Sequence, residues 1–333
     1  MKLKKRKTQI GVGGTVITPL HKRLVAEVLD SGRLTYGPFL KRFEAEFAKR
    51  HARRFAVSTN SGTSALIAAL GTLKALDGWK DGDEVIVPAL TFIATSNAVL
   101  HNGLWPVFAD VESRTFHIDP AEIEKRITKK TRAIMPVHLW GVSCEMAPIM
   151  KIARRRGLRV INDSAQALGV NHRGAPVGSE GDIACYSTYV SHIVTTGEGG
   201  MLLTNDPKIA VGVRSMISHG RDSIYLAADD DRGLSGERLR EVMGRRFQFV
   251  TAGFNFRAGE ISGALGMAEF SILEKNIAAR QRNAGRLSEG LSPFAGYLQL
   301  PWWPAHSAHS FMMFPIAGKR RRFRRDELKH FLE

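Results

Sequence analysis

The sequence predicts an α/β fold with a mostly parallel central sheet flanked by helices. Two observations support this prediction. Short apolar runs typical of buried strands alternate with longer segments of helical periodicity through residue 204. Glycine, proline and short polar stretches separate these segments, as turns between strands and helices require. Elements in this order place the strands side by side and the helices on both faces of the sheet.

Composition limits the class of protein. With 333 residues, the chain can bury a sizeable core and form one large domain plus a smaller one. Hydrophobic residues make up 44% and charged residues 24%, as in a soluble globular protein, and no apolar run approaches the ~18 residues of a membrane span. Neither a sustained apolar segment nor a cleavage site follows the basic start, so we expect a cytoplasmic protein without a membrane partner.

The number of cysteines and the net charge limit which metal sites and binding partners can be expected. Only Cys144 and Cys185 are present, which excludes a disulfide scaffold and a four-cysteine metal or iron–sulfur site, and we expect no metal. The formal net charge of +16 is compatible with nucleic-acid binding. However, the basic residues are spread over helices and chain ends and are not interleaved with aromatic residues. We therefore favour a solvated basic surface, which also attracts an anionic substrate, over a nucleic-acid partner.

The first 50 residues contain two predicted helices. One runs between Thr18, a typical N-cap, and Gly32, a typical residue after a helix end. A loop with the sequence GRLTYGP follows. The second helix carries Leu40, Phe43 and Phe47 at helical spacing, which predicts that this face is buried.

A strand, a glycine turn and a helix follow in the stretch FAVSTNSGTSALIAAL. The strand covers residues 55–57, the turn residues 60–62 and the helix residues 64–76. Unpaired N–H groups and the positive end of the helix dipole meet at such a turn, which predicts a phosphate site with Thr63 and Ser64 as donors. The Ser-Gly-Thr-Ser sequence can equally be no more than a helix cap.

The next elements continue the alternation of strands and helices. A helix is predicted at residues 94–101, and strands at residues 84–87, 105–110, 132–138 and 158–161. Phe92 lies in the loop after the first of these strands, where it can also be an ordinary core residue. Asp163 follows the last strand, where an aspartate is often the N-cap of a helix.

The stretch from Tyr186 to Asp206 carries the most functional information. A strand at residues 183–187 leads into a glycine-rich turn, and a second strand follows at residues 201–204. A serine, a reactive side chain five residues later and a Thr-Gly-Glu-Gly-Gly turn resemble the cofactor-lysine segment of the DegT/StrS family of nucleotide-sugar aminotransferases, which depend on pyridoxal 5'-phosphate (PLP). Here His192 stands at the lysine position.

Four further stretches carry the same resemblance, in the family's order: GRLTYGP, NSGTS, NDSAQALG and GFNFRAG. The resemblance implies the fold-type-I PLP-transferase architecture, a homodimer, and a place in deoxysugar or O-antigen polysaccharide biosynthesis. It also implies a large PLP-binding domain over residues 1–275, with its N-terminal helical segment at residues 1–50. A smaller α+β domain is expected over residues 276–333, and we expect it to be incomplete.

The resemblance implies a role for each of eight residues. They are Thr63, Ser64 and Ser187 on the cofactor phosphate, Phe92 stacked on the pyridine ring, Asp163 on the ring nitrogen, Gln166 on the ring hydroxyl, Asn255 on the phosphate of the partner subunit's cofactor, and His192 as the catalytic residue. A carboxylate such as Asp163 keeps the ring nitrogen protonated, which makes the ring an electron sink. The polar insertion at residues 226–246 is expected to be a loop and helix over the substrate, and one long helix through Ile272 is expected to end the large domain.

The histidine at position 192 distinguishes between activities. A lysine amine can form a covalent link to PLP, whereas an imidazole can only move protons or donate hydrogen bonds. The family branch with this exchange uses pyridoxamine 5'-phosphate (PMP), formed with an amino donor such as glutamate, to remove the C3 hydroxyl of nucleotide-linked 4-keto-6-deoxy sugars. We expect this dehydration, with His192 as acid and base at its ordinary pKa of ~6.5. The alternatives are sugar amino transfer in spite of His192, and a non-catalytic protein that binds PLP or a sugar.

Overall fold

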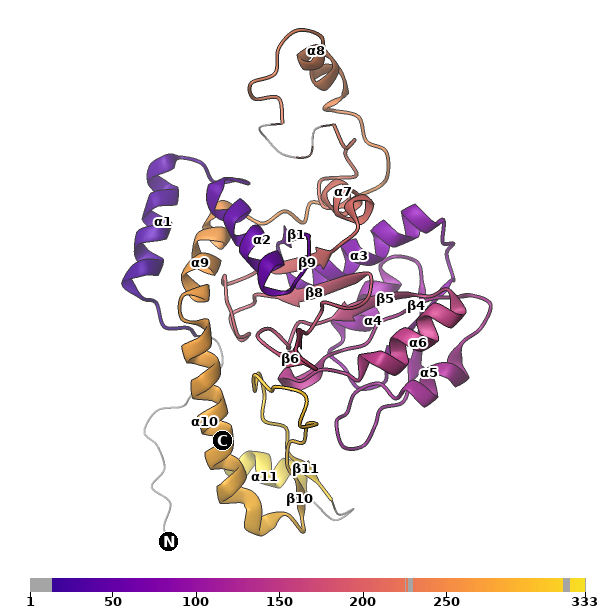
Figure 1. The fold of residues 1–333 in the computed structure, drawn as a ribbon, viewed down its shortest axis with the longest axis vertical. Helices are drawn as coiled ribbons and strands as arrows, with labels where there is room; N and C mark the ends of the chain where they lie inside the picture. The colour runs from indigo at the N-terminus through magenta and orange to yellow at the C-terminus, as the bar shows by residue number, and fades with distance from the viewer. Residues whose placement is uncertain (1–13, 225, 227–229, 320–323, 333) are drawn as a thin grey trace.

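A seven-stranded sheet forms the centre of this computed structural model, which describes residues 14–224, 226, 230–319 and 324–332. The strand order is β1-β9-β8-β5-β4-β2-β3 (Figure 1). The strands are β1 (Phe55–Thr59), β2 (Glu84–Pro88), β3 (Trp105–Ala109), β4 (Thr131–Ile134), β5 (Arg159–Asp163), β8 (Ile183–Ser187) and β9 (Gly200–Thr204).

The sheet is mostly parallel, as predicted. Strands β8, β5, β4, β2 and β3 pair in parallel, whereas β9 runs antiparallel to both of its neighbours, β8 and β1. In β8 and β9 every residue is buried, which is typical of strands covered on both faces. The carboxyl ends of the parallel strands therefore lie along one edge of the sheet, where α/β proteins bind ligands.

Helices cover both faces of the sheet. The helices are α1 (Pro19–Ser31), α2 (Pro38–Arg50), α3 (Gly62–Asp77), α4 (Ala94–Leu100), α5 (Pro120–Arg126), α6 (Met146–Arg156), α7 (Pro207–Met216), α8 (Gly236–Arg245), α9 (Glu260–Phe270), α10 (Leu273–Leu291) and α11 (Arg325–Leu332). Shorter elements are the 3₁₀ helices η1 (Leu139–Gly141) and η2 (Ser292–Phe294), and two small hairpins, β6 (Asn171–His172) with β7 (Ala175–Pro176) and β10 (Leu298–Gln299) with β11 (Ala317–Gly318).

The alternation of side chains along each strand divides the core between the two faces. In β8, Ile183 and Cys185 join the core under α3, α4 and α7. Ala184 and Tyr186 point the other way and join the core under α2 and α9. A third cluster lies between β2, β4 and β5 on one side and α5 and α6 on the other. Both faces of the sheet are therefore apolar, so we expect the polar side chains of a functional site at the ends of the strands.

The N-terminal prediction is confirmed. Thr18 is the N-cap of α1, and Gly32 follows its end with φ of 66°, a conformation that glycine adopts at little cost. Helix α3 begins at Gly62, two residues before the predicted start. Strand β4 ends at Ile134 instead of His138, because Pro136 has no N–H to donate to a ladder.

The long helix predicted through Ile272 is instead two helices, α9 and α10. The hydroxyl of Ser271 donates to the carbonyl of Ala268 at 2.6 Å, which competes with the backbone pairing that would continue α9. The predicted domain boundary at residues 275/276 falls inside α10. The division into two domains stays a prediction.

The C-terminal segment after α10 lies against the large sheet-containing unit. The backbone N–H groups of Ser310 and Met313 donate to the carbonyls of Gly141 and Trp140, at 2.9 and 3.2 Å. Within residues 309–319, only Ala317–Gly318 pairs as a strand, with β10. Among the described residues, no helix combines the length and apolarity that crossing a bilayer demands.

The insertion at residues 226–246 contains the helix α8, which lies on an arm that projects from the α7 end of the molecule (Figure 1). The described residues of this arm are not among those that line the cavity described below. The expectation that the insertion lies over the substrate stays a prediction. Residues 225 and 227–229 lie outside the described part.

Candidate active site

A cavity of about 380 Å³ lies where the carboxyl ends of β5 and β8 meet the start of α3. It brings together six of the eight predicted site residues: Thr63, Phe92, Asp163, Gln166, Ser187 and His192. The remaining lining residues are Ser61, Gly62, Leu66, Thr91, Ala94, Val137, Ala165, Tyr189, Ser191, Glu198, Met312 and Met313. Elements from three distant parts of the sequence therefore form one site.

The start of α3 forms one end of the cavity. Ser61 is the N-cap, and its hydroxyl accepts a hydrogen bond from the backbone N–H of Ser64 at 3.0 Å. The helix geometry leaves the N–H groups of Gly62 and Thr63 without intrahelical acceptors, so they can bind an anion. A Cβ on Gly62 would lie 2.7 Å from Cβ of Ser187. Glycine at this position therefore allows Ser187, at the end of β8, to approach the helix start.

Ser64 is placed differently from the other predicted phosphate donors. It does not line the cavity, and it lies buried behind the helix start. Its hydroxyl accepts from that of Ser61 at 2.9 Å. The side chain of Ser64 thus takes part in the cap, which agrees with the capping interpretation of this sequence.

Asp163 supplies the buried carboxylate of the site. It is the last residue of β5, and the hydroxyl of Thr95 donates to its Oδ2 at 2.8 Å. The backbone N–H of Ala165 donates to Oδ1 at 3.2 Å. Burial raises the pKa of Asp163 above its ordinary value, although both hydrogen bonds oppose this shift. A cationic N–H group in the cavity would find here a carboxylate that has no charged partner in the described part of the chain.

Gln166 and Phe92 both contribute to the lining. The side-chain oxygen of Gln166 accepts from the backbone N–H of Trp140 at 2.8 Å, which fixes the orientation of the amide. Its NH₂ group remains as the donor for a ligand. Phe92 is 68% exposed, which excludes the alternative that it is a core residue. An exposed aromatic ring at a cavity is available for stacking.

His192 lies in the turn between β8 and β9. Its Nδ1 is buried and has no hydrogen-bond partner among the described residues. Burial lowers the pKa of His192 to about 4, and the positive charge of Arg280 contributes to this shift. The expectation of an ordinary pKa is therefore wrong for this structure. At neutral pH the imidazole is uncharged, and it can accept a proton.

The turn that carries His192 is fixed at both ends. The backbone N–H of Thr188 donates to Gly199 O at 2.9 Å, and that of Thr196 donates to Thr188 O at 2.8 Å. A Cβ on Gly200 would lie 2.3 Å from Ser61 O, so this glycine lets β9 pack directly against the α3 cap. The Thr-Gly-Glu-Gly-Gly sequence thus closes one side of the cavity.

Asn255 is not brought to the cavity of its own chain. It is exposed, its backbone forms a bridge with Ser218, and its side-chain oxygen accepts from Arg257 Nε at 3.1 Å. Its predicted role was across a subunit interface. That role stays a prediction.

Among the residues at the site that had not been predicted, three come from distant parts of the sequence. Thr95 supports Asp163 from 68 residues away in the sequence, and Met312 and Met313 come from the C-terminal segment. The sequence patterns used above are local and do not pair residues across such distances.

Comparisons with known proteins agree with this geometry. The model of the DegT/DnrJ/EryC1/StrS aminotransferase family matches residues 16–333. The chain is 38% identical over 293 residues to GDP-perosamine synthase of Caulobacter vibrioides, covering 88% of this chain and 72% of that protein. It is 33% identical over 338 residues to dTDP-4-dehydro-2,6-dideoxy-D-glucose 3-dehydratase of Saccharopolyspora spinosa, covering 98% of this chain and 72% of that protein.

Solved structures show the same likeness. GDP-4-keto-6-deoxy-D-mannose-3-dehydratase of E. coli, with bound hydrated PLP, superposes with a TM-score of 0.86 at 26% identity. The alignment covers 96% of this chain and 82% of that one. The predicted fold-type-I architecture is thereby confirmed.

Proposed function

We propose that this chain, which belongs to the DegT/DnrJ/EryC1/StrS aminotransferase family, is a dehydratase. The proposed reaction removes the C3 hydroxyl of a nucleotide-linked 4-keto-6-deoxy sugar. The observation that carries this proposal is the imidazole of His192 in the lining of the cavity. Relatives in the family include both aminotransferases and a 3-dehydratase, and the imidazole at position 192 supports the second of these activities.

The cavity suits PLP or PMP as the cofactor. Gly62, Thr63 and Ser187 form a cradle for its phosphate, which a Cβ on Gly62 would fill. Asp163 would hold the ring nitrogen, since its carboxylate is buried and accepts only neutral hydrogen bonds from the described residues Thr95 and Ala165. Gln166 would donate to the ring hydroxyl, and Phe92 would stack on the ring. When bound, the cofactor supplies an electron sink next to the sugar carbons.

His192 then acts as the proton carrier. Its neutral imidazole accepts a proton and returns one to the departing C3 hydroxyl of the sugar. The side chain has no amine and cannot form a covalent tether to the cofactor. Positioning comes from the turn ends at Thr188 and Gly199, which hold the imidazole at the cavity.

A second candidate is amino transfer to the C4 ketone of a nucleotide sugar. The 38% identity to a GDP-perosamine synthase favours it, as does the glycine turn at residues 196–200. In that case glutamate would supply the amine and His192 would only shuttle protons. Glutamate is also the amino donor that we propose for the dehydratase, and we propose a cytoplasmic location for either activity.

We propose that the working form is a homodimer. Asn255 is exposed and lies outside the cavity of its own chain, which suits a residue that serves the site of a second copy. Leu90, Phe92, Ile93 and Tyr189 are apolar or aromatic and remain 41–68% exposed near the cavity. A partner subunit would cover such side chains.

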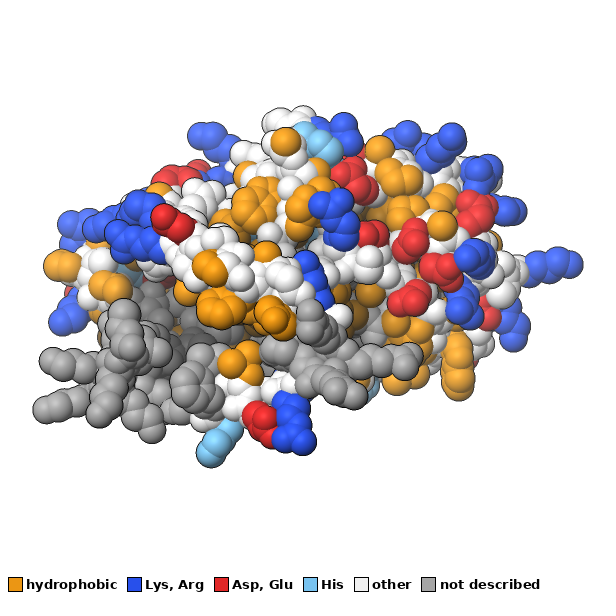
Figure 2. Space-filling view, turned by 90° about the horizontal axis from the view of Figure 1, so that it is seen from below, with side chains coloured by type: hydrophobic (Ala, Val, Ile, Leu, Met, Phe, Trp, Pro, Cys, Tyr) orange, Lys and Arg blue, Asp and Glu red, His pale blue; other side chains and the backbone are white. Residues whose placement is uncertain are grey.

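Figure 2 shows basic side chains spread over one face with acidic ones between them, a surface that suits an anionic sugar nucleotide.

Product analysis tests the proposal. The full chain is incubated with PLP, glutamate and GDP-4-keto-6-deoxymannose, and the product is identified by mass spectrometry and NMR. A 3-deoxy ketosugar is expected, and the cofactor should be released on denaturation without borohydride trapping. A 4-amino sugar with its C3 hydroxyl intact would instead establish the second candidate.

Two variants separate chemistry from folding. His192→Lys should gain amino transfer and a cofactor trapped by borohydride. His192→Asn, which has a similar polar group but no base, should bind PLP and lose dehydration by about 10²–10⁴-fold. Dehydration at the wild-type rate in His192→Asn would refute the role of the imidazole.

A further inference from the structure

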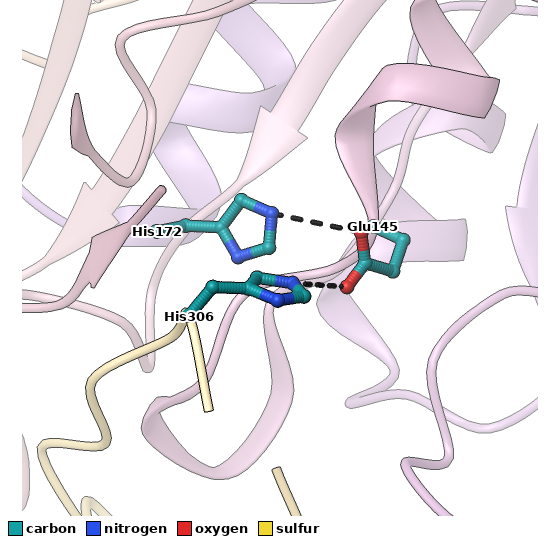
Figure 3. Close-up of side chains that lie close together, drawn as sticks. All are labelled: Glu145, His172 and His306. Carbon is teal, nitrogen blue, oxygen red and sulfur yellow. Dashed lines mark hydrogen bonds and ion pairs between the residues drawn. The ribbon is translucent and has the colours of Figure 1, made fainter. Parts of the chain in front are cut away.

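Outside the cofactor cavity, a glutamate and two histidines from three distant segments converge (Figure 3). Glu145 precedes α6, His172 ends β6, and His306 lies in the C-terminal segment. His306 Nε2 lies 2.9 Å from Glu145 Oε1, and His172 Nε2 lies 3.7 Å from Glu145 Oε2. One donor atom from each residue lies within 4.8 Å of the others.

His172 has an unexplained environment for a buried imidazole. Its side chain is only 7% exposed, and its Nδ1 has no hydrogen-bond partner in the described parts of the chain. Its Nε2 faces Glu145 at a distance that is too long for a hydrogen bond. A buried polar group left in this way costs about 1–3 kcal/mol. A cation between His172 Nε2 and Glu145 would give the imidazole a partner at Nε2, but it would not reach Nδ1.

We propose that Glu145, His172 and His306 bind a divalent cation of the zinc class. Two imidazoles and one carboxylate are a donor set that Zn²⁺ uses, with the fourth position open to water. Ligand atoms at roughly 2.0–2.1 Å in a tetrahedron lie roughly 3.4 Å from one another. The donor atoms here need only small side-chain rotations to reach that spacing.

The charges around the site are consistent with an exchange of cations. In this structure the guanidinium of Arg173 donates to Glu145 Oε2 at 3.3 Å. Arg173 is exposed, so it can turn into solvent when a metal takes its place.

The backbone prearranges the ligand from the C-terminal segment. Arg173 N donates to His306 O and Ala308 N donates to Asn171 O, both at 2.8 Å. His172 also forms an isolated bridge with Ser307. The metal would therefore join the C-terminal segment to the β6 hairpin and α6. The same segment continues to Met312 and Met313 in the cofactor cavity, so the metal would help to hold one side of that cavity.

The experiment is a titration of the EDTA-treated full chain with ZnCl₂ by calorimetry, in the absence of PLP and sugar. One Zn²⁺ per chain is expected, together with a rise in the melting temperature. Co²⁺ in place of Zn²⁺ should give the visible absorption of a four-coordinate site. These readouts do not depend on the proposed reaction, so the metal site and the proposed function can fail separately.

Variants assign the ligands. His306→Ala, His172→Ala and Glu145→Gln should each weaken Zn²⁺ binding by at least about 100-fold, since even outer-shell partners contribute 10–100-fold. His101→Ala, which changes an exposed histidine outside the cluster, is the matched control and should bind like the wild type. Arg173→Ala should bind more tightly, because it removes the competing cation.

The contrary outcomes are equally definite. Wild-type binding no tighter than that of Glu145→Gln, or equal weakening by His101→Ala, would overturn the proposal. Arg173→Ala remains informative if a histidine variant fails to fold. Unchanged or weaker binding in Arg173→Ala would show that the cluster is only a hydrogen-bonded ion pair.

Discussion

Two walls of the cofactor cavity are built in different ways. The strand-end wall comprises Asp163, Ser187 and His192 with the helix start at Gly62 and Thr63. Its backbone is anchored by the ladders of β5, β8 and β9. The C-terminal wall comprises Met312 and Met313, which lie on a segment without regular structure.

The C-terminal wall depends on a few polar contacts. Arg280 of α10 donates to the carbonyls of Phe311 and Met312 at 3.2 and 3.3 Å. Gly141 accepts from Ser310 N, and a Cβ on Gly141 would lie 2.6 Å from Ser310 Oγ. The sheet therefore positions the side chains proposed to take part in the reaction, whereas a few individual hydrogen bonds hold the C-terminal segment over the cavity. Substitutions should therefore affect rate on one wall and affinity and stability on the other.

The largest effect is expected for Asp163→Asn on the strand-end wall. The variant keeps the size of the side chain and one oxygen that can accept from Ala165 N or Thr95 Oγ1. It removes the carboxylate that would hold a protonated ring nitrogen. We expect turnover to fall by about 10²–10⁴-fold with the fold intact, measured by steady-state kinetics and circular dichroism. Thr95→Val is the matched control and should lose much less. Equal losses in the two variants would contradict the assigned role of the charge.

Acid should weaken both walls, because each has a buried histidine. Burial lowers the pKa of His192 and of His309 to about 4. A depressed histidine pKa contributes stability above the unfolded value of ~6.5, and this contribution disappears as the pH falls through about 4. The free energy of unfolding should therefore fall between pH 6.5 and pH 4, by roughly 3 kcal/mol per histidine at most. Urea denaturation across this range measures it.

The variant His309→Asn tests the contribution of His309 to this pH dependence of the free energy of unfolding. His309 Nδ1 accepts from the backbone N–H of Phe311 at 2.9 Å, and the oxygen of asparagine can replace it without titrating. The pH dependence should become shallower than that of the wild type. An unchanged slope would show that His309 does not titrate on unfolding.

Arg280→Ala should loosen the C-terminal wall. The loss of two hydrogen bonds from a charged donor should cost about 1.5–3 kcal/mol in the free energy of unfolding. It should also raise the pKa of His192, since Arg280 contributes to its depression. Chemical denaturation and an NMR titration of the histidines measure the two effects. Arg282→Ala, an exposed arginine of the same helix, should change neither.

Gly62→Ala tests the close approach in the strand-end wall. The added Cβ must displace Ser187, which should cost about 1–3 kcal/mol and weaken PLP binding. The matched control is Gly244→Ala in α8, where a Cβ meets no atom within 4 Å. That control should be neutral or gain up to about 1 kcal/mol. PLP affinity in Gly62→Ala equal to wild type would refute the cradle.

The smallest effect is expected at the far end of the C-terminal segment. The guanidinium of Arg114 lies 3.9 Å from the ring centroid of Trp302. Arg114→Ala should cost about 0.5–1 kcal/mol, as a partly exposed cation–π contact does. Turnover should stay unchanged, and thermal unfolding measures the loss. A large drop in turnover would show that the two walls are more closely coupled than the structure indicates.

The sequence predicted the strand-end wall better than the C-terminal wall, for a physical reason. Asp163, Ser187 and His192 follow short apolar strands, and the ends of such strands can be located from local patterns. Asp206 and Pro207 are a typical helix start, yet α7 was not among the predicted elements. Met312 lies in the cavity because of contacts with residues far away in sequence. Local periodicity does not contain that information.

The Glu145, His172 and His306 cluster illustrates the same limit. Gaps of 27 and 134 residues between its members, taken from their positions, match no metal-binding motif. The depressed pKa of His192 was also unpredictable, because it depends on burial in the folded chain and on Arg280. Residue identity could be read from the sequence, whereas the environment of each residue could not.

The reversal of β9 has a consequence for how such a site can evolve. Because β9 pairs with β8, residues 188–199 form a turn whose two ends are held by the sheet. A different side chain at position 192 would therefore start from the same backbone position beside the cavity. One codon can thus exchange an anchoring amine for a proton carrier, and the scaffold offers alternative reactions without being rebuilt.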